Sequence, residues 1–165
     1  MSRFQLAQLN VGVTLGPMDS PVMAEFVANL DPINALADAA PGFVWRLQTE
    51  DGNATSISPL GDNMIVNLSV WDDLASLNRY VYKSAHVDIV KRRKERFARM
   101  EESYVALWWV ARGHRPSVDE ALERLAHLRT HGPSEHAFSF RQPYPAPDTP
   151  AASAPGWLGD ACPAE

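Results

Sequence analysis

Short apolar segments alternate along the chain with longer segments in which apolar residues recur every three or four positions. The first pattern is typical of strands, and the second is typical of amphipathic helices. Strands are predicted at residues 3–13, 43–49, 63–71 and 104–111, with a short additional strand at 137–141.

Helix signals fall between these strands. Residues 21–40 favour a helix that is interrupted at Asp31–Pro32, because proline removes a helical backbone donor. Asp72 is expected to cap the next helix. A longer helix is expected to begin at Ser84 and to end near residue 100.

Ser117 and Glu120 have the spacing of a capping box and predict a last helix that stops before Gly132. The element order is then β-α-β-β-α-β, followed by one more helix and one more strand. This order predicts an α+β fold of the ferredoxin-like type with an added C-terminal helix and strand.

The middle strands are apolar on both faces, and every residue from 105 to 110 is apolar. A sheet that is wet on one side should be polar at alternate positions. If the helices cover one face, the other face would expose a large apolar patch to water. The pattern therefore favours a homodimer in which the sheets of two subunits pack face to face.

Composition narrows the setting. The formal net charge of −5 offers no basic excess for phosphates, which argues against a nucleic-acid partner. The single cysteine, Cys162, cannot form an internal disulfide, so no oxidising compartment is needed. The N-terminal residues lack the features of a signal peptide, and no apolar stretch approaches the length of a membrane span. We expect a cytoplasmic protein with no membrane partner.

The C-terminal part has a different composition. Six of the thirteen prolines lie in residues 143–165. We expect one domain at residues 1–142, followed by a Pro/Ala-rich tail at 143–165 that is disordered or lies on a partner.

The helix expected from Ser84 carries the main candidate for chemistry, His86. This histidine begins the stripe that should face the sheet, formed by His86, Ile89, Val90, Arg93, Phe97, Met100 and Tyr104. One interpretation is a core histidine with a satisfied hydrogen bond. The other is a general base or hydrogen-bond donor, because a neutral imidazole near pH 7 suits proton transfer.

Two tyrosines precede this histidine. Tyr82 lies four residues before His86, so one continuous helix would stack the two side chains. Tyr80 lies six residues before it, about 120° away around a straight helix, and a break at Lys83–Ser84 would bring it back towards a pocket. Packing with the hydroxyl groups at a wet edge is the alternative.

The aromatic residues of the strands could form either the core or the walls of a site for a planar molecule. Trp45 and Arg46 alternate on one strand, so they face opposite sides. We favour Trp45 on the pocket side and Arg46 on the dimer side. The reverse register would place Arg46 in the pocket, as a group that binds an anion.

No metal site is expected. His127 and His131 have the spacing of a helical ligand pair, but Glu123 lies about 12 Å along the helix from His131. The chain also has no phosphate-binding loop, dinucleotide fingerprint, nucleophile elbow or paired CxxC motif.

Three segments resemble one bacterial family. They are PGFVWRL, VWDDLASLNRYVYKSAHVDIVKRRKERF and ALWWVARGHRPSVDEALERLAHLRTHGPSEHAFSF. Together with their surroundings, at roughly residues 3–142, they are similar to the family labelled domain of unknown function thirty-two ninety-one. That family is placed in the dimeric α/β-barrel superfamily, with cofactor-free antibiotic-biosynthesis monooxygenases, muconolactone isomerases, stress-responsive barrel proteins, polyketide cyclases and haem-degrading enzymes.

The resemblance implies a homodimer that forms an α/β barrel. It also implies that Tyr80 and His86 correspond to the tyrosine–histidine pair of the barrel-type polyketide cyclases, which handles protons in an aldol closure. Those cyclases have a further histidine where this chain has Lys83.

We therefore expect an enzyme without metal or organic cofactor that acts on an apolar, aromatic or polyketide-like small molecule. The reaction would be an oxygenation, isomerisation or cyclisation by a monooxygenase, isomerase or cyclase. The alternatives are a haem-binding or haem-degrading protein with a histidine as axial ligand, or a non-catalytic binding module. The expected catalytic residues are His86, Tyr80 and Tyr82, and the expected substrate-binding residues are Trp45, Trp71, Arg93, Phe97, Tyr104 and Trp109.

Overall fold

The chain folds into an α+β arrangement. The computed structural model describes residues 2–16, 19–48, 64–83 and 103–149. Their elements are β1 (Phe4–Val13), α1 (Ala24–Asp38), β2 (Phe43–Arg46), β3 (Met64–Trp71), α2 (Leu74–Lys83), β4 (Val105–Ala111) and α4 (Val118–His131). Within these residues, the helices are too short or too polar to cross a membrane.

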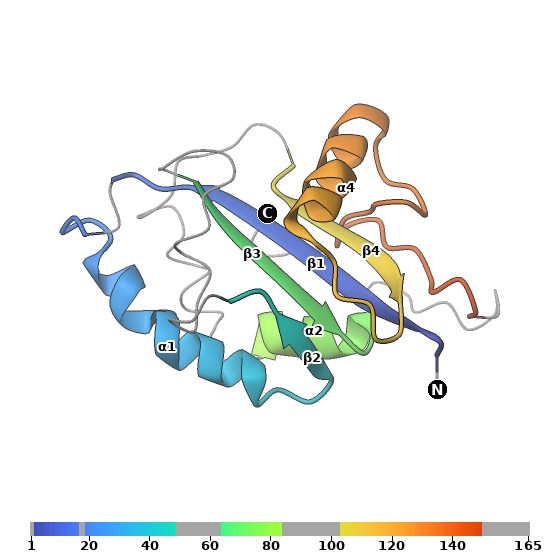
Figure 1. Cartoon of the computed structure of the whole chain (residues 1–165), viewed down its shortest axis with the longest axis horizontal. Coiled ribbons are helices and arrows are strands. Elements are labelled where there is room, and N and C mark those ends of the chain that lie inside the picture. Colours follow the sequence, from blue (N-terminus) through green and yellow to red (C-terminus); the bar gives the residue numbers. More distant parts are fainter. Residues whose placement is uncertain (1, 17–18, 49–63, 84–102, 150–165) are drawn as a thin grey trace.

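The strands form one antiparallel sheet in the order β2-β3-β1-β4 (Figure 1). β1 lies inside the sheet and pairs with β3 and β4, which agrees with its almost continuous burial. The additional strand predicted at 137–141 is wrong in its extent. Phe138 alone forms a bridge to Leu107 of β4, because the chain bends on both sides of it.

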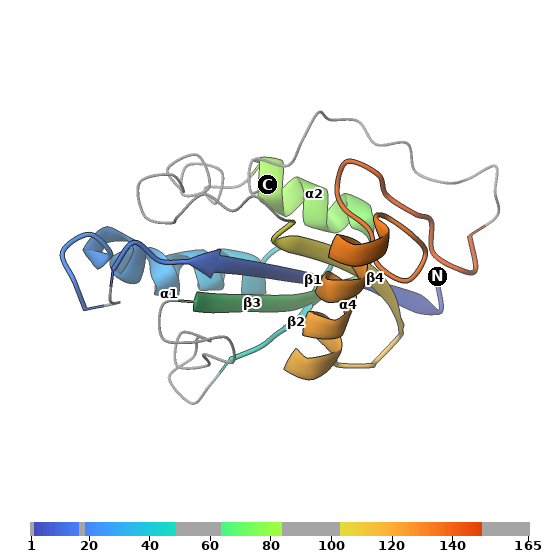
Figure 2. The same cartoon turned by 90° about the horizontal axis from the view of Figure 1, so that it is seen from above.

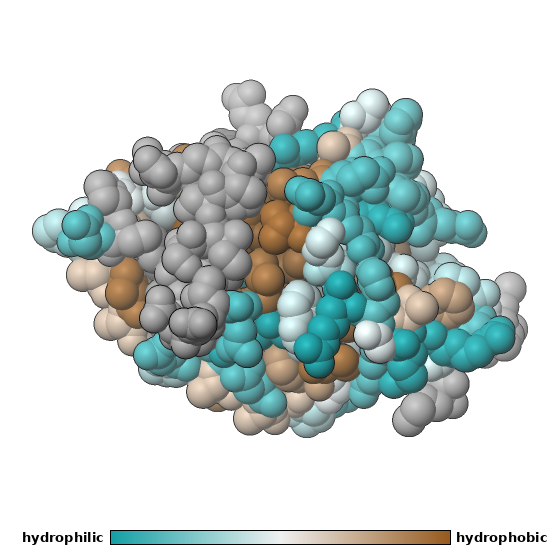
Figure 3. All heavy atoms as spheres, viewed as in Figure 1, coloured by the Kyte–Doolittle hydropathy of each residue, from teal (hydrophilic) through white to brown (hydrophobic). Residues whose placement is uncertain are grey.

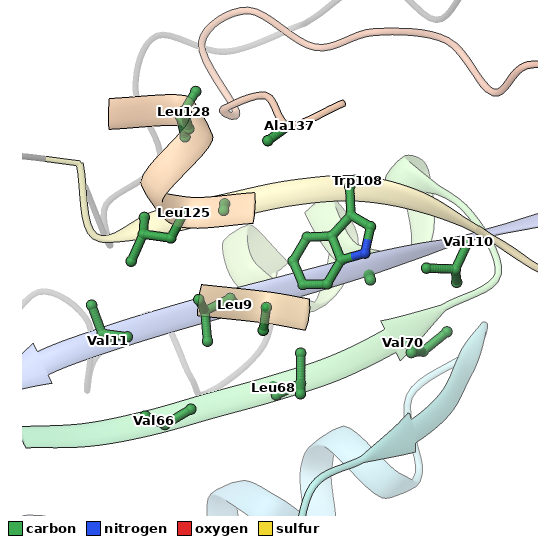
Figure 4. Close-up of a cluster of buried hydrophobic side chains, with 13 residues drawn as sticks. Leu9, Val11, Val66, Leu68, Val70, Trp108, Val110, Leu125, Leu128 and Ala137 are labelled. Atoms are coloured by element: carbon green, nitrogen blue, oxygen red, sulfur yellow. The ribbon is translucent and has the colours of Figure 1, made fainter. Parts of the chain in front are cut away.

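One face of the sheet, here called the α4 face, packs against α4. Alternate residues of β1, β3 and β4 form its core together with one side of α4, as Figure 4 shows. The residues are Ala7, Leu9, Val11, Val66, Leu68, Val70, Ala106, Trp108 and Val110 of the strands and Ala121, Leu125 and Leu128 of α4.

The position of α4 bears on the predicted dimer. One face of the sheet was expected to pack against a second subunit, but α4 of the same chain covers much of that face. Apolar surface remains visible beside α4 in Figure 3, and Trp45, Leu47 and Met64 are the partly exposed apolar residues near β2 and β3.

The opposite face, here called the cavity face, packs against α2, which lies across the sheet from α4 (Figure 2). Leu6, Trp71 and Leu107 of the strands meet Leu74 and Leu77 of α2. Phe138 and Phe140 complete this cluster from the segment after α4. That segment therefore passes around the β4 edge of the sheet, from one face to the other.

The helix boundaries differ from prediction in two places. α1 continues through Pro32, so the predicted interruption is wrong. Both Pro32 and the residue four positions before it, Ala28, are exposed, so water can satisfy the carbonyl that proline leaves unbonded. The backbone amide of Ser76 donates to Asp73 at 2.7 Å, so Asp73, and not Asp72, caps α2.

The capping box predicted for α4 is half formed. Ser117 accepts from the backbone amide of Glu120 at 3.1 Å, as expected. The Glu120 carboxylate turns away from the cap and contacts His114 Nε2 at 2.8 Å and Trp108 Nε1 at 3.1 Å. These two contacts tie the start of α4 to β4.

The chain after residue 142 does not leave the fold at once. Trp109 Nε1 donates to the carbonyl of Tyr144 at 2.9 Å. The carboxylate of Asp148 accepts from Ser2 Oγ and from the backbone amide of Arg3, both at 2.7 Å. Residues 143–149 thus pack on their own chain, whereas 150–165 lie outside the described residues.

Candidate functional site

A small cavity lies on the cavity face, between the sheet and helices α1 and α2. Its volume is about 60 Å³, and its described lining consists of Gln8, Asn10, Ile33, Asn34, Ala37, Phe43, Arg46, Asn67, Ser69, Trp71, Leu77, Tyr80, Val81 and Phe140. Ligand sites commonly measure roughly 300–1,000 Å³, so a ligand of several rings requires part of this wall to move.

The strands supply a polar floor to this cavity. Gln8 of β1 pairs with Ser69 of β3, and Ser69 in turn pairs with Arg46 of β2. In the next row, Asn10 pairs directly with Asn67. Side chains at these positions point to the same side of the sheet, because strand residues alternate faces with a period of two.

Part of the polar floor forms a hydrogen-bonded chain. Trp71 Nε1 donates to Ser69 Oγ at 3.0 Å, and Ser69 Oγ donates to Gln8 Oε1 at 2.9 Å. All three side chains are buried. The chain holds the indole of Trp71 and the amide of Gln8 in fixed orientations, since each buried polar group has a partner.

An aromatic wall stands beside the polar floor. The rings of Trp71 and Tyr80 are stacked, with centroids 5.1 Å apart and an interplanar angle of 29°. Phe43 meets Trp71 edge-on at 5.4 Å. Tyr80 Oη donates to the carbonyl of Ile33 in α1 at 3.3 Å.

Tyr80 keeps its proton throughout the physiological range. Burial raises the pKa of its phenol well above the ordinary value, and the negative charge of Asp38 adds to the rise. The positive charge of Arg46 opposes it only in part. The hydroxyl is therefore a neutral hydrogen-bond donor and not a base.

Arg46 is held at the cavity by Asp38, the last residue of α1. Its Nε lies 2.8 Å from Asp38 Oδ1 and its Nη2 lies 3.2 Å from Asp38 Oδ2. The side chain of Arg46 is only 12% exposed. Within the described lining, Arg46 is the one charged side chain, and the carboxylate of Asp38 balances its charge.

The predicted orientation of β2 is corrected by this arrangement. The register shifts between Phe43 and Trp45, so Val44 is an extra residue opposite β3. Phe43 and Arg46 consequently face the cavity, and Trp45 packs on the α4 face. The prediction of Trp45 as a pocket wall is therefore wrong, and the reverse register holds.

The other predicted site residues fall into three groups. Trp71 and Tyr80 line the cavity. Tyr82, Tyr104 and Trp109 pack against the apolar cluster of the cavity face but are not part of the described lining. His86, Arg93 and Phe97 lie outside the described residues.

The sequence also contains a signal for the polar floor, although the predicted site residues include none of its amides. Gln8 and Asn10, and again Asn67 and Ser69, are polar residues two positions apart in strands that are otherwise apolar. A polar pair at this spacing in a buried strand indicates one polar strip on one face. Asn34 of α1 carried no comparable signal, and Arg46 of β2 was expected in the pocket only if the register of its strand were reversed.

Metal chemistry has no support from the described side chains. Among them, no three histidine, cysteine, aspartate or glutamate residues are arranged to hold an ion.

Fold and cavity together define a class, an α+β protein with a partly polar site enclosed between an antiparallel sheet and its helices. Comparison with known families is more specific. The model of the family described as Domain of unknown function (DUF3291) matches residues 5–154. The chain belongs to this family, as its motifs suggested.

No curated protein matches the chain. Among solved structures, it is similar to SnoaB, a cofactor-independent oxygenase from Streptomyces nogalater, with 18% identity over 69% of this chain and 96% of SnoaB and a TM-score of 0.42. It is also similar to PA3566 from Pseudomonas aeruginosa, with 16% identity over 69% of this chain and 98% of that one and a TM-score of 0.44. A third is NE2512 from Nitrosomonas europaea, a protein of unknown function, with 14% identity over 70% of this chain and 95% of that one and a TM-score of 0.42.

Similarities of this size do not establish what the chain does. The proposed function therefore rests on the cavity of this chain.

Proposed function

We propose that the chain is an enzyme without a metal or organic cofactor, and that it binds an oxygen-bearing aromatic molecule in the cavity beside Trp71. The polar floor carries this proposal. Gln8 and Ser69 are buried and bonded to each other, whereas Asn10 is half-buried and Asn67 is exposed, so these two amides can reach a ligand. A floor with amides and a cation is suited to a ligand with several oxygen atoms.

This ligand class is narrower than the apolar, aromatic or polyketide-like one expected from sequence. The stacked rings of Trp71 and Tyr80 favour a planar molecule, while the amides of Asn10 and Asn67 can each donate to one ligand oxygen and accept from another. A phenol or an enolisable ketone on an aromatic ring has both properties.

The reaction proposed first is oxygenation through the anion of the substrate. Removal of a proton from the substrate leaves an enolate, whose oxygen accepts hydrogen bonds from the side-chain amides of Asn10 and Asn67. The enolate carbon reduces O₂ and forms a C–O bond to a hydroperoxide, which loses water to give a ketone. His86 as the base remains a prediction, since it lies outside the described residues.

Oxygen uptake with 1,8-dihydroxyanthrone, in the presence of a chelator, tests this proposal. One anthrone and one O₂ should give one anthraquinone and one water. Replacing Asn10 or Asn67 with leucine should lower kcat/KM about a hundredfold, because each removes a donor to the developing oxyanion. Thr130→Leu is the control, since Thr130 is exposed on α4, away from the cavity.

Two other outcomes would favour a different function. If the anthrone binds, and binding depends on Asn10 and Asn67, but no oxygen is consumed, the chain is a binding module. If the purified protein takes up haemin with a Soret band that Asn10→Leu leaves unchanged, the haem alternative is favoured.

The homodimer through the sheet also remains a proposal. A second copy would cover the part of the α4 face near β2 and β3, where Trp45, Leu47 and Met64 are partly exposed. Sedimentation velocity tests it. A dimer that dissociates when Leu47 is changed to Asp would support it, and a monomeric wild type would overturn it.

A further inference from the structure

Three imidazole rings gather where the chain leaves α4. His127 and His131 lie one turn apart on the helix, with ring centroids 4.5 Å apart. His136 returns to the same place after the chain turns at Gly132, and its ring centroid also lies 4.5 Å from that of His127. His127 is thus flanked by two other histidines.

His136 is held by two charged residues of α4. Its Nε2 contacts both carboxylate oxygens of Glu123, at 2.9 and 3.0 Å. Arg124 Nη1 lies 2.9 Å from His136 Nδ1 and donates to the carbonyl of His136 at 2.8 Å. A guanidinium can only donate, so Nδ1 must be the acceptor and Nε2 must carry the proton. A second proton, on Nδ1, would face Arg124 directly.

His127 is poorly placed to become charged. Its Nδ1 is buried and has no hydrogen-bond partner in the described structure. Burial lowers the pKa of His127, and the charges of His136, His131 and Arg124 lower it further, against the opposing effect of Glu123. These four side chains, three of them from α4 and one from the segment beyond it, are the titratable and charged groups around the ring.

The residues beside this cluster close the cavity. Phe138 and Leu107 exchange two backbone hydrogen bonds of 2.8 Å across the β4 edge. Two residues later, Phe140 is fully buried and lines the cavity. The contacts of His136 with Arg124 and Glu123 therefore anchor the start of the segment that leads to Phe140.

We propose that His127, which lies between His131 and His136, is a proton-sensitive latch that holds residues 134–140 across β4 while it is neutral and releases them when it is protonated. Because the closed state favours the neutral form of His127, this histidine stabilises the closed state fully at pH values above the ordinary histidine pKa of about 6.5. The stabilisation declines as the pH falls below that value. Acid therefore loosens the wall formed by Phe140, and this does not depend on which ligand the cavity takes.

Hydrogen exchange on the full chain tests the latch. Protection factors, which correct for the intrinsic effect of pH, are compared at about pH 7.5 and about pH 5.5 for peptides that cover β4 and residues 134–141. Protection of the Leu107 and Phe138 amides should fall severalfold at the lower pH, because protonation of His127 favours the open state. Amides shared by β1 and β3 should keep their protection.

Two variants make the result specific. His127→Gln should remove the pH dependence, because glutamine does not titrate in this range. His114→Gln is the matched control, since His114 pairs with Glu120 at the other end of α4, and it should keep the wild-type response. The latch is overturned if the wild type shows no local change, if His127→Gln keeps the change, or if β1 and β3 lose protection in parallel.

Should His127→Gln not fold, NMR titration of the wild type still decides. The His127 ring signals and the Phe138 amide signal should then shift together, with a midpoint below the ordinary histidine pKa of about 6.5. Independent midpoints would overturn the proposal.

Discussion

The two faces of the sheet carry different kinds of side chain, although both are buried in the same domain. On the α4 face, the residues of β1, β3 and β4 are apolar, except for the buried Gln5 near the start of β1. On the cavity face, apolar residues such as Leu6 and Trp71 occupy one end, and Gln8, Asn10 and Asn67 occupy the other.

This difference separates stability from function. The α4 face packs as a continuous core, where each buried apolar side chain contributes to the free energy of unfolding. The polar half of the cavity face contributes less of that kind, because Asn10 is half-buried and Asn67 is exposed. The expected effects of substitution should therefore differ between the faces.

Leu9→Ala should give the largest effect on stability. Leu9 is fully buried on the α4 face, so the substitution should lower the free energy of unfolding by about 2–5 kcal/mol. Denaturant unfolding followed by circular dichroism measures this change. A loss below about 1 kcal/mol would mean that the α4 face is not the main core.

Ser69→Ala should have an intermediate effect. It removes the hydroxyl that links Trp71 Nε1 to Gln8, which leaves two buried polar groups without that partner. The expected loss is about 1–3 kcal/mol in the same denaturant experiment. Ser103→Ala, at an exposed position, is the control and should be neutral. Equal stability of both variants would show that water in the cavity replaces the hydroxyl.

The ionisation of Tyr80 gives a pH-dependent test of the aromatic wall. Its pKa is raised in the folded chain, so the unfolded chain loses the phenolic proton first as the pH rises above about 10. Stability should therefore fall above that pH, by at most about 1.4 kcal/mol per unit from this group. Absorbance at the phenolate band should show that Tyr80 ionises only with unfolding. Tyr80→Phe should remove that step, and an unchanged titration curve would contradict the burial of the hydroxyl.

Asn10→Leu should have the smallest effect on stability, although Asn10 is the immediate neighbour of Leu9. Its side chain points into the cavity, where leucine replaces polar contacts with apolar ones, so the change should stay within about 1 kcal/mol. Thermal unfolding measures it, alongside the activity test described above. A large destabilisation would show that the polar floor is structural, and the contrast between the two faces would then lose its functional meaning.

Much of the fold followed from local patterns. The apolar alternation located the four described strands, and Ser117 located the start of α4. The prediction failed where a tertiary contact overrides a local preference, as in the uninterrupted α1 and the single bridge at Phe138. Trp71, an aromatic residue at a strand end, and Tyr80, chosen for its spacing from His86, both line the cavity, whereas the amides were not recognised.

By itself, the sequence determined the order of elements and the presence of two buried faces, because both follow from residue periodicity along a short stretch of chain. It did not determine which element covers which face, since α4 and the segment around Phe138 reach opposite sides of the sheet through contacts distant in sequence. The bulge at Val44 decided that Arg46 faces the cavity and Trp45 does not. One extra residue inverts the alternation, and only pairing with β3 reveals where it is inserted.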